Sequence, residues 1–199
     1  KKCSPKQLVE NSNGTIDVTI ESESIYVCAY ANYKKSSSEI VCSEAYKLDK
    51  TKPTAGTIDI TGTKGENDWY VSNVSISPID GTDNLSGHAE TMIEPVSITK
   101  NTTGDKVIVT TKDRADNVST REYIIKVDVD EPTVTLTKKV ENNKNVLVAN
   151  TNSMTSGYSY EWYKNGNIIE NAKEETYTTT ESGKYKVKVT TGAGNSKTS

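Results

Sequence analysis

Hydrophobic and polar residues alternate in many short stretches along this chain. Apolar side chains occupy every second position in residues 16–20, 57–61, 74–77, 96–99 and 134–137. A period of two is typical of antiparallel strands that bury one face and expose the other. No stretch of about 11 residues or more repeats its apolar positions with the helical period. The pattern therefore predicts an all-β fold with almost no helix.

Three longer alternating strands each run into a short turn rich in Gly, Asn, Asp or Ser. These strands begin at Tyr26, Val107 and Tyr185. After the first two turns a second alternating strand follows. Strand, short turn and strand in this order predict β-hairpins, and their recurrence indicates a repeated module.

Two proline-containing segments divide the chain. In residues 46–54 and 125–133 an alternating strand ends in Asp, a charged stretch and Pro-Thr. Proline lacks a backbone donor and extends the residue before it, so it marks a boundary better than a strand interior. We predict three parts, residues 1–49, 50–130 and 131–199. The first is too short for a complete β-sandwich of about 100 residues, so we expect it to hold only the C-terminal strands of a module.

Composition narrows the structural class. The chain has 18 Val, 15 Ile and 27 Thr, but only 5 Leu and no Phe. Stiff β-branched side chains suit the half-buried surface of a sheet. Because only 33% of the residues are hydrophobic, each core must be small. We therefore expect thin β-sandwiches.

Charge and motifs exclude several function classes. A net charge of −3 gives no basic surface for nucleic acid, and no apolar run approaches the ~18 residues of a membrane span. No apolar stretch follows Lys1-Lys2-Cys3, so we expect no signal peptide and take the chain as a mature or excised fragment. One His and three Cys leave few zinc ligands. No phosphate loop or nucleophile elbow occurs, so we expect a non-enzymatic protein without catalytic residues or a bound cofactor.

The third part contains the most specific motif. Residues 159–166 read Ser-Tyr-Glu-Trp-Tyr-Lys-Asn-Gly and resemble strand C of an immunoglobulin-like domain, with Trp162 as the buried core residue. Residues 181–187 resemble the tyrosine corner, in which Tyr185 stands two positions before Val187. Antibody domains have a cysteine where this chain has Val187, so the usual inter-sheet disulfide is ruled out in this part.

The middle part resembles a further set of bacterial immunoglobulin-like modules. Its motifs are Asp-Lys-Thr-Lys-Pro-Thr at 49–54, an early strand with Trp69 in the core, Asn-Leu-Ser-Gly at 84–87 and Asp-Arg-Ala-Asp-Asn at 113–117. The usual form of the last motif is Asp-x-Ala-Gly-Asn, and Asp116 replaces its glycine. Aspartate tolerates left-handed backbone better than most residues, so the turn can be retained.

The resemblance implies tandem immunoglobulin-like β-sandwich domains of a secreted or cell-surface bacterial protein. Such modules act as stalks, spacers or adhesive units. We expect a monomeric rod that binds an extracellular protein or a glycan. One alternative is an accessory module of a large secreted enzyme, for example a carbohydrate-active one, whose catalytic domain lies elsewhere. A second alternative is a subunit of a fibre, pilus or phage tail built by strand exchange.

The cysteines leave three alternatives open. The strands that carry Cys28 and Cys42 flank a turn centred near Lys35, so the two side chains can face each other and form a cross-strand disulfide. A pair that involves Cys3 is the second alternative, and reduced thiols are the third. Export favours oxidation.

Acidic loops are the candidate metal site. In an immunoglobulin-like sandwich the B–C and F–G loops share one end, which brings Asp80, Asp83, Asp113 and Asp116 together and places Asp49 near them. Clustered carboxylates suit Ca²⁺, which would stiffen the joint between modules. The alternative is a solvated loop without an ion, because the spacing of an EF-hand is absent. The same question arises at Asp128, Asp130 and Glu131.

Two surface features have ordinary structural explanations. Lys184, Lys186 and Lys188 alternate with apolar residues. These three lysines either form the solvent-exposed face of a strand or bind an acidic glycan. The 11 Tyr and two Trp either fill cores or line a carbohydrate platform. We favour the structural explanation for both.

Overall fold

A computed structural model describes residues 17–199 of the chain. These residues form β-strands and contain no helix, so the prediction of an all-β fold is confirmed. No helix that could cross a membrane occurs between residues 17 and 199. Of the predicted first strand, residues 17–20 are described, and they are not in a strand. They are exposed and pair with no strand in the described part of the chain.

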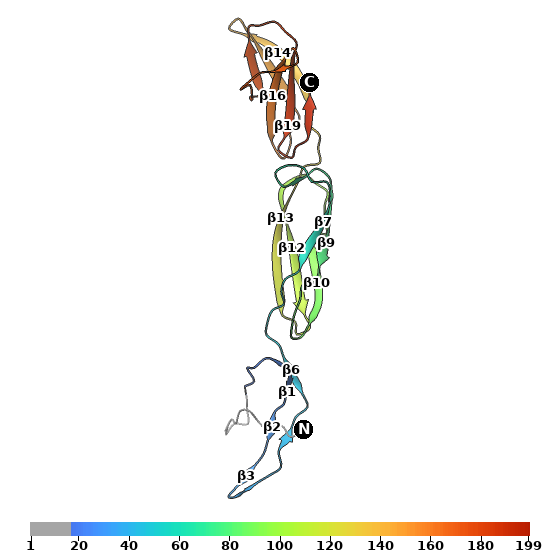
Figure 1. Ribbon diagram of the computed structural model, residues 1–199, viewed down its shortest axis with the longest axis vertical. Coiled ribbons are helices and arrows are strands. Elements are labelled where there is room, and N and C mark those ends of the chain that lie inside the picture. The colour runs from blue at the N-terminus through green and yellow to red at the C-terminus, as the bar shows by residue number, and fades with distance from the viewer. Residues whose placement is uncertain (1–16) are drawn as a thin grey trace. The chain divides into compact units, whose positions relative to one another are not determined.

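The strands follow one another along the chain as Figure 1 shows. The N-terminal ones are β1 (Ser22–Ile25), β2 (Cys28–Ala29), β3 (Asn32–Tyr33), β4 (Ser36–Ser37), β5 (Val41–Cys42) and β6 (Tyr46–Leu48). The middle ones are β7 (Thr57–Thr61), β8 (Trp69–Tyr70), β9 (Val74–Ile79), β10 (His88–Glu94), β11 (Ser97–Ile98), β12 (Thr102–Asp113) and β13 (Val118–Val127). The last ones are β14 (Val134–Glu141), β15 (Lys144–Thr151), β16 (Tyr158–Lys164), β17 (Asn167–Ile168), β18 (Thr176–Thr179), β19 (Tyr185–Thr191) and β20 (Ser196–Thr198).

The chain divides into two compact units. Of the described residues, unit 1 contains 17–56, 80–91 and 110–120, and unit 2 contains 57–79, 92–109 and 121–199. The division passes through β10, β12 and β13, so the predicted boundaries at 49/50 and 130/131 stay a prediction.

The N-terminal strands form three short antiparallel pairs, β1–β6, β2–β5 and β3–β4. Cys28 lies directly opposite Cys42, and a disulfide joins them. Cys3 lies outside the described residues. No side chain from residue 17 to residue 50 whose exposure is described is buried.

Two sheets make up the middle strands, in the orders β10-β12-β13-β8 and β11-β9-β7. In unit 2 a hydrophobic cluster fills the space between them, with Val74 and Ile76 from one sheet and Val107, Ile125 and Val127 from the other. In β12 the alternating pattern places every second side chain in the interior, because residues 107, 109, 111 and 113 are all buried. This part is therefore β-sandwich-like, with a core of β-branched side chains.

The last strands repeat this arrangement in the orders β14-β15-β18 and β17-β16-β19-β20. Leu147 and Ala149 of β15 face Trp162 of β16 and Val187 and Val189 of β19. This core shares no residue with the cluster of the middle strands. Of the alternating lysines, Lys184 and Lys186 are exposed and Lys188 is half-buried.

The three predicted core aromatics occupy different depths. Trp162 is fully buried, and its indole N–H donates to the carbonyl oxygen of Glu174 at 2.8 Å. Trp69 is buried with Lys126 Nζ 5.5 Å from its ring centroid. Tyr185 is half-buried, packs against the C-terminal core, and donates its hydroxyl to the Glu181 carbonyl oxygen at 3.1 Å.

Replacing Trp162 with alanine should destabilise the C-terminal core by about 3–5 kcal/mol, because a large cavity forms. Replacing Val140 with alanine should change the free energy of unfolding by no more than about 0.5 kcal/mol, because this side chain is 65% exposed on β14. Chemical denaturation of the full chain measures both free energies of unfolding. The transition is followed by far-ultraviolet circular dichroism, which does not rely on the fluorescence of the replaced tryptophan. Equal effects of the two substitutions would contradict the assigned core.

Candidate functional site

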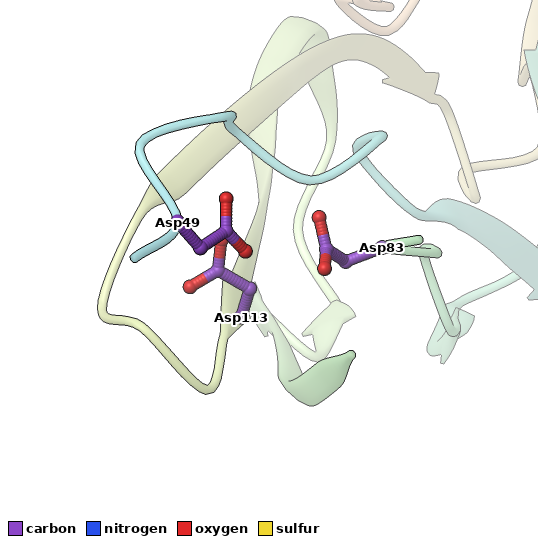
Figure 2. A group of neighbouring side chains, drawn as sticks. All are labelled: Asp49, Asp83 and Asp113. Atoms are coloured by element: carbon purple, nitrogen blue, oxygen red, sulfur yellow. The ribbon is translucent and has the colours of Figure 1, made fainter. Parts of the chain in front are cut away.

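Three carboxylates from separate segments of unit 1 meet at one end of the middle strands. They are Asp49 from the linker after β6, Asp83 from the loop after β9, and Asp113 at the end of β12 (Figure 2). One oxygen of each lies within 4.8 Å of one oxygen of both others. Asp113 is fully buried, and the other two are half-buried. With Ser86 and Asn117, which bind them, they form what we call the first linker site.

Asp113 organises the turn between β12 and β13. Its Oδ1 accepts the backbone N–H groups of Ala115 at 2.8 Å and Asn117 at 2.9 Å, and its Oδ2 accepts the Asn117 side-chain amide at 2.9 Å. At the tip of this turn Asp116 has a φ of +69°, so an aspartate adopts left-handed backbone where the usual motif has glycine. The buried carboxylate thus satisfies the donors that the turn would leave unpaired.

Asp83 organises the neighbouring loop in the same way. Its Oδ1 accepts the backbone N–H groups of Leu85 at 3.0 Å and Gly87 at 2.8 Å. Gly87 has a φ of +84°, which a glycine adopts without strain. Its carbonyl oxygen accepts the backbone N–H of Arg114 at 3.0 Å, which ties this loop to the β12–β13 turn.

Asp49 attaches the linker to both loops. Its Oδ2 accepts the backbone N–H of Ser86 at 2.9 Å, and its carbonyl oxygen accepts the side-chain amide of Asn117 at 3.2 Å. Its Oδ1 accepts the N–H of Thr51 at 2.9 Å. The linker therefore lies on the loops through bonds of both its side chain and its backbone.

The other two predicted metal ligands point elsewhere. Asp80 lies with its Oδ1 3.7 Å from His88 Nε2, and 71% of its side chain is exposed. Asp116 pairs with Lys112 at 2.6 Å, and its hydrogen bond raises the pKa of the lysine above its ordinary value. The structure thus brings Asp83 and Asp113 together with Asp49, and it leaves Asp80 and Asp116 outside that group.

The first linker site has the geometry of a group that can share one cation. Two oxygens bound to the same Ca²⁺ at 2.3–2.6 Å lie at most about 5 Å apart, and the carboxylate oxygens here fall within 4.8 Å. Among the described residues no ion pair involves Asp49, Asp83 or Asp113. Backbone N–H groups already bind all three carboxylates, so the group also has a purely structural role.

Unit 2 contains a second linker site with a related set of hydrogen bonds. Its linker residue is Asp128, whose Oδ2 accepts the backbone N–H of Ser156 at 2.9 Å, as Asp49 Oδ2 accepts that of Ser86. Asp128 also donates its backbone N–H to the Tyr70 carbonyl oxygen at 2.8 Å. It is fully buried, and its Oδ1 has no hydrogen-bond partner among the described residues.

The hairpin of this second site, between β19 and β20, is built like the one between β12 and β13. Thr191 Oγ1 accepts the backbone N–H of Asn195 at 3.1 Å, where Asp113 Oδ1 accepts that of Asn117. The Asn195 side-chain amide lies 3.5 Å from the carbonyl oxygen of Asp130. The hydroxyl of Thr191 thus accepts the asparagine N–H in one hairpin, and the carboxylate of Asp113 accepts it in the other. The hydrogen bond to this N–H therefore does not require a charged acceptor.

A loop of the middle strands contacts the same β19–β20 hairpin within unit 2. The backbone N–H of Glu66 donates to the Ala193 carbonyl oxygen at 2.8 Å, and the Asn67 side-chain amide donates to that of Gly192 at 3.0 Å. A Cβ on Gly65 would lie 2.2 Å from the Ala193 oxygen, so only glycine permits this approach. Sequence reasoning missed this contact, although the glycines on both sides, at 65 and 194, were a usable signal.

Comparison with protein-family models and with curated proteins finds no match for this chain.

Replacing Asp113 with alanine should lower the free energy of unfolding by about 1–3 kcal/mol, because the N–H groups of Ala115 and Asn117 lose their acceptor. Asp113→Thr is the matched control, since Thr191 holds the equivalent position, and it should recover much of the loss. Chemical denaturation and amide exchange in residues 113–118 measure both variants. Equal destabilisation by alanine and threonine would show that hydrogen-bond acceptance is not the role of this residue.

Proposed function

We propose that this chain is a non-enzymatic structural segment of a bacterial cell-surface protein, in which immunoglobulin-like modules act as a stalk or as an adhesive unit. The single observation that carries the proposal is the repeated linker site. In each unit an aspartate before the Pro-Thr segment accepts the backbone N–H of a Ser-Gly loop. A backbone carbonyl of the same linker, that of Asp49 or of Asp130, accepts the side-chain amide of an asparagine in the last hairpin. These hydrogen bonds order the linker. A spacer needs an ordered linker, whereas an enzyme does not require one.

The sheet orders support the immunoglobulin-like assignment. Strands β10, β12 and β13 are neighbours in one middle sheet, and β8 adds to its edge in parallel with β13, pairing Trp69 with Lys126. In the last part β16, β19 and β20 are neighbours in the same way. Trp162 on β16 lies opposite Val187 on β19, which is the core position that the sequence motif implies.

The contacts of the second linker site support a restricted orientation of the two cores of unit 2. Asp128 binds Tyr70 through its backbone and Ser156 through its side chain, so one residue bridges both cores. The loop at Glu66 adds a backbone hydrogen bond to Ala193. Short linkers that hold such bonds limit independent motion of the modules.

Replacing Asp128 with alanine should weaken this bridge roughly 10- to 100-fold, since a hydrogen bond to a charged acceptor contributes about 1.5–3 kcal/mol. Asp128→Asn keeps the volume and an acceptor oxygen and is the matched control. Residual dipolar couplings of the full chain should fit one alignment tensor for both cores in the native protein and in Asp128→Asn, and two tensors in Asp128→Ala. Two independent tensors in the native protein would overturn the spacer proposal.

Two measurements separate the alternative functions. Concentration-dependent polymers in light scattering would favour the fibre, pilus or phage-tail subunit. Selective binding on a glycan array would favour an adhesive module or an accessory module of a secreted carbohydrate-active enzyme. A monomeric chain with a flat array supports the spacer role.

We also propose calcium as the ligand of the first linker site. The observation behind it is the comparison of the two sites, since the second forms the equivalent hairpin bond with Thr191 and has Ser153 at the position corresponding to Asp83. The first site therefore holds two carboxylates at positions where the second site has hydroxyl side chains, and the mutual repulsion of its three carboxylates falls when a cation binds.

Millimolar calcium should raise the thermal stability of the native chain relative to the same chain in chelator. The gain is about 2.7 kcal/mol when calcium exceeds its dissociation constant 100-fold. Asp83→Asn should abolish the gain, and Asp80→Asn, outside the group of three, should retain it. An unchanged melting temperature in calcium would leave the carboxylates as purely structural acceptors.

A further inference from the structure

The N-terminal strand pairs lack the hydrophobic core that holds the other strands. Every side chain from 17 to 50 whose exposure is described is at least partly exposed. Ile20, Val41 and Tyr46 are 70%, 71% and 58% exposed. Two-stranded pairs without a buried face are marginally stable in water, so burial contributes little to keeping these strands together.

The disulfide supplies the constraint that burial does not. Cys28 and Cys42 lie opposite each other in the β2–β5 pair. β3–β4 lies inside the 14-residue separation that the bond closes, and β1–β6 lies outside it. A cross-link at this position shortens the loop that β1–β6 must close, and it restricts the unfolded conformations of the segment that carries β3–β4. Both effects reduce the entropy lost when the strands pair.

The bond is open to attack from solvent. Cys42 is exposed and Cys28 is half-buried. A thiolate of a dithiol reductant can attack one sulfur, which breaks the S–S bond and forms a mixed disulfide. The second thiol of the reductant then displaces the remaining protein thiol. The products are two cysteine thiols and one cyclic disulfide of the reductant, so electrons and protons balance.

We propose that the Cys28–Cys42 disulfide is a redox-sensitive switch that controls whether residues 22–48 are ordered. In the oxidised chain the strand pairs form. Reduction by a dithiol releases them, while the two cores of unit 2 stay folded because they contain no cysteine. This goes beyond the spacer function, because it makes the order of one segment depend on the redox state of the surroundings.

Hydrogen exchange of the full chain, followed by mass spectrometry with and without a dithiol reductant, tests the switch. Reduction should speed amide exchange in residues 22–48 on the order of a hundredfold, the size expected when a loop constraint of about 15 residues is lost. Exchange in β12, β13, β16 and β19 should not change. Alkylation with mass detection of Cys28 and Cys42 verifies that both were reduced.

Two double variants separate the covalent bond from side-chain packing. Cys28→Ser with Cys42→Ser should reproduce the fast exchange without reductant. Cys28→Val with Cys42→Val keeps an apolar cross-strand pair and should exchange equally fast. Slow exchange in the valine variant, or fast exchange already in the oxidised native chain, would overturn the proposal. So would loss of protection in the unit 2 cores on reduction.

Discussion

The structure depends on burying one face of each strand with short, β-branched side chains. In β12 the buried row runs through Val107, Val109 and Thr111 to Asp113, so the same alternation that builds the core changes from apolar to polar at the end of the strand. Small side chains give thin cores, and thin cores leave loop ends that burial alone does not order. Carboxylates that accept several N–H groups order them instead.

The two linker sites show how one backbone arrangement tolerates different chemistry. In both, an aspartate side chain accepts the N–H of a serine, and the last hairpin is closed by an oxygen that accepts the N–H of an asparagine. That oxygen belongs to a carboxylate in Asp113 and to a hydroxyl in Thr191. The hairpin bond is therefore retained while the charge of its acceptor changes.

The N-terminal strand pairs illustrate the opposite case. They have the turn residues and the alternation of a hairpin, and Cys28 and Cys42 face each other, but none of their described side chains is buried. Local pattern pairs these strands, with a register irregularity in β1–β6, and the disulfide joins β2 to β5 where the two cysteines lie opposite each other. Without a second sheet, the hydrophobic term that stabilises the other strands contributes little here.

Period-two alternation and turn residues determined the all-β class, most strands and the hairpin turns, because these signals act between near neighbours in the chain. The tertiary structure alone decided which carboxylates meet. Asp80 and Asp83 share one loop, and Asp113 and Asp116 share one turn, so sequence proximity does not distinguish them. Asp83 and Asp113 accept N–H groups two and four residues further along the chain, whereas Asp80 and Asp116 remain exposed. Asp49 joins them through bonds from Ser86 and Asn117, 37 and 68 residues away, and only the folded chain brings groups so distant in sequence together.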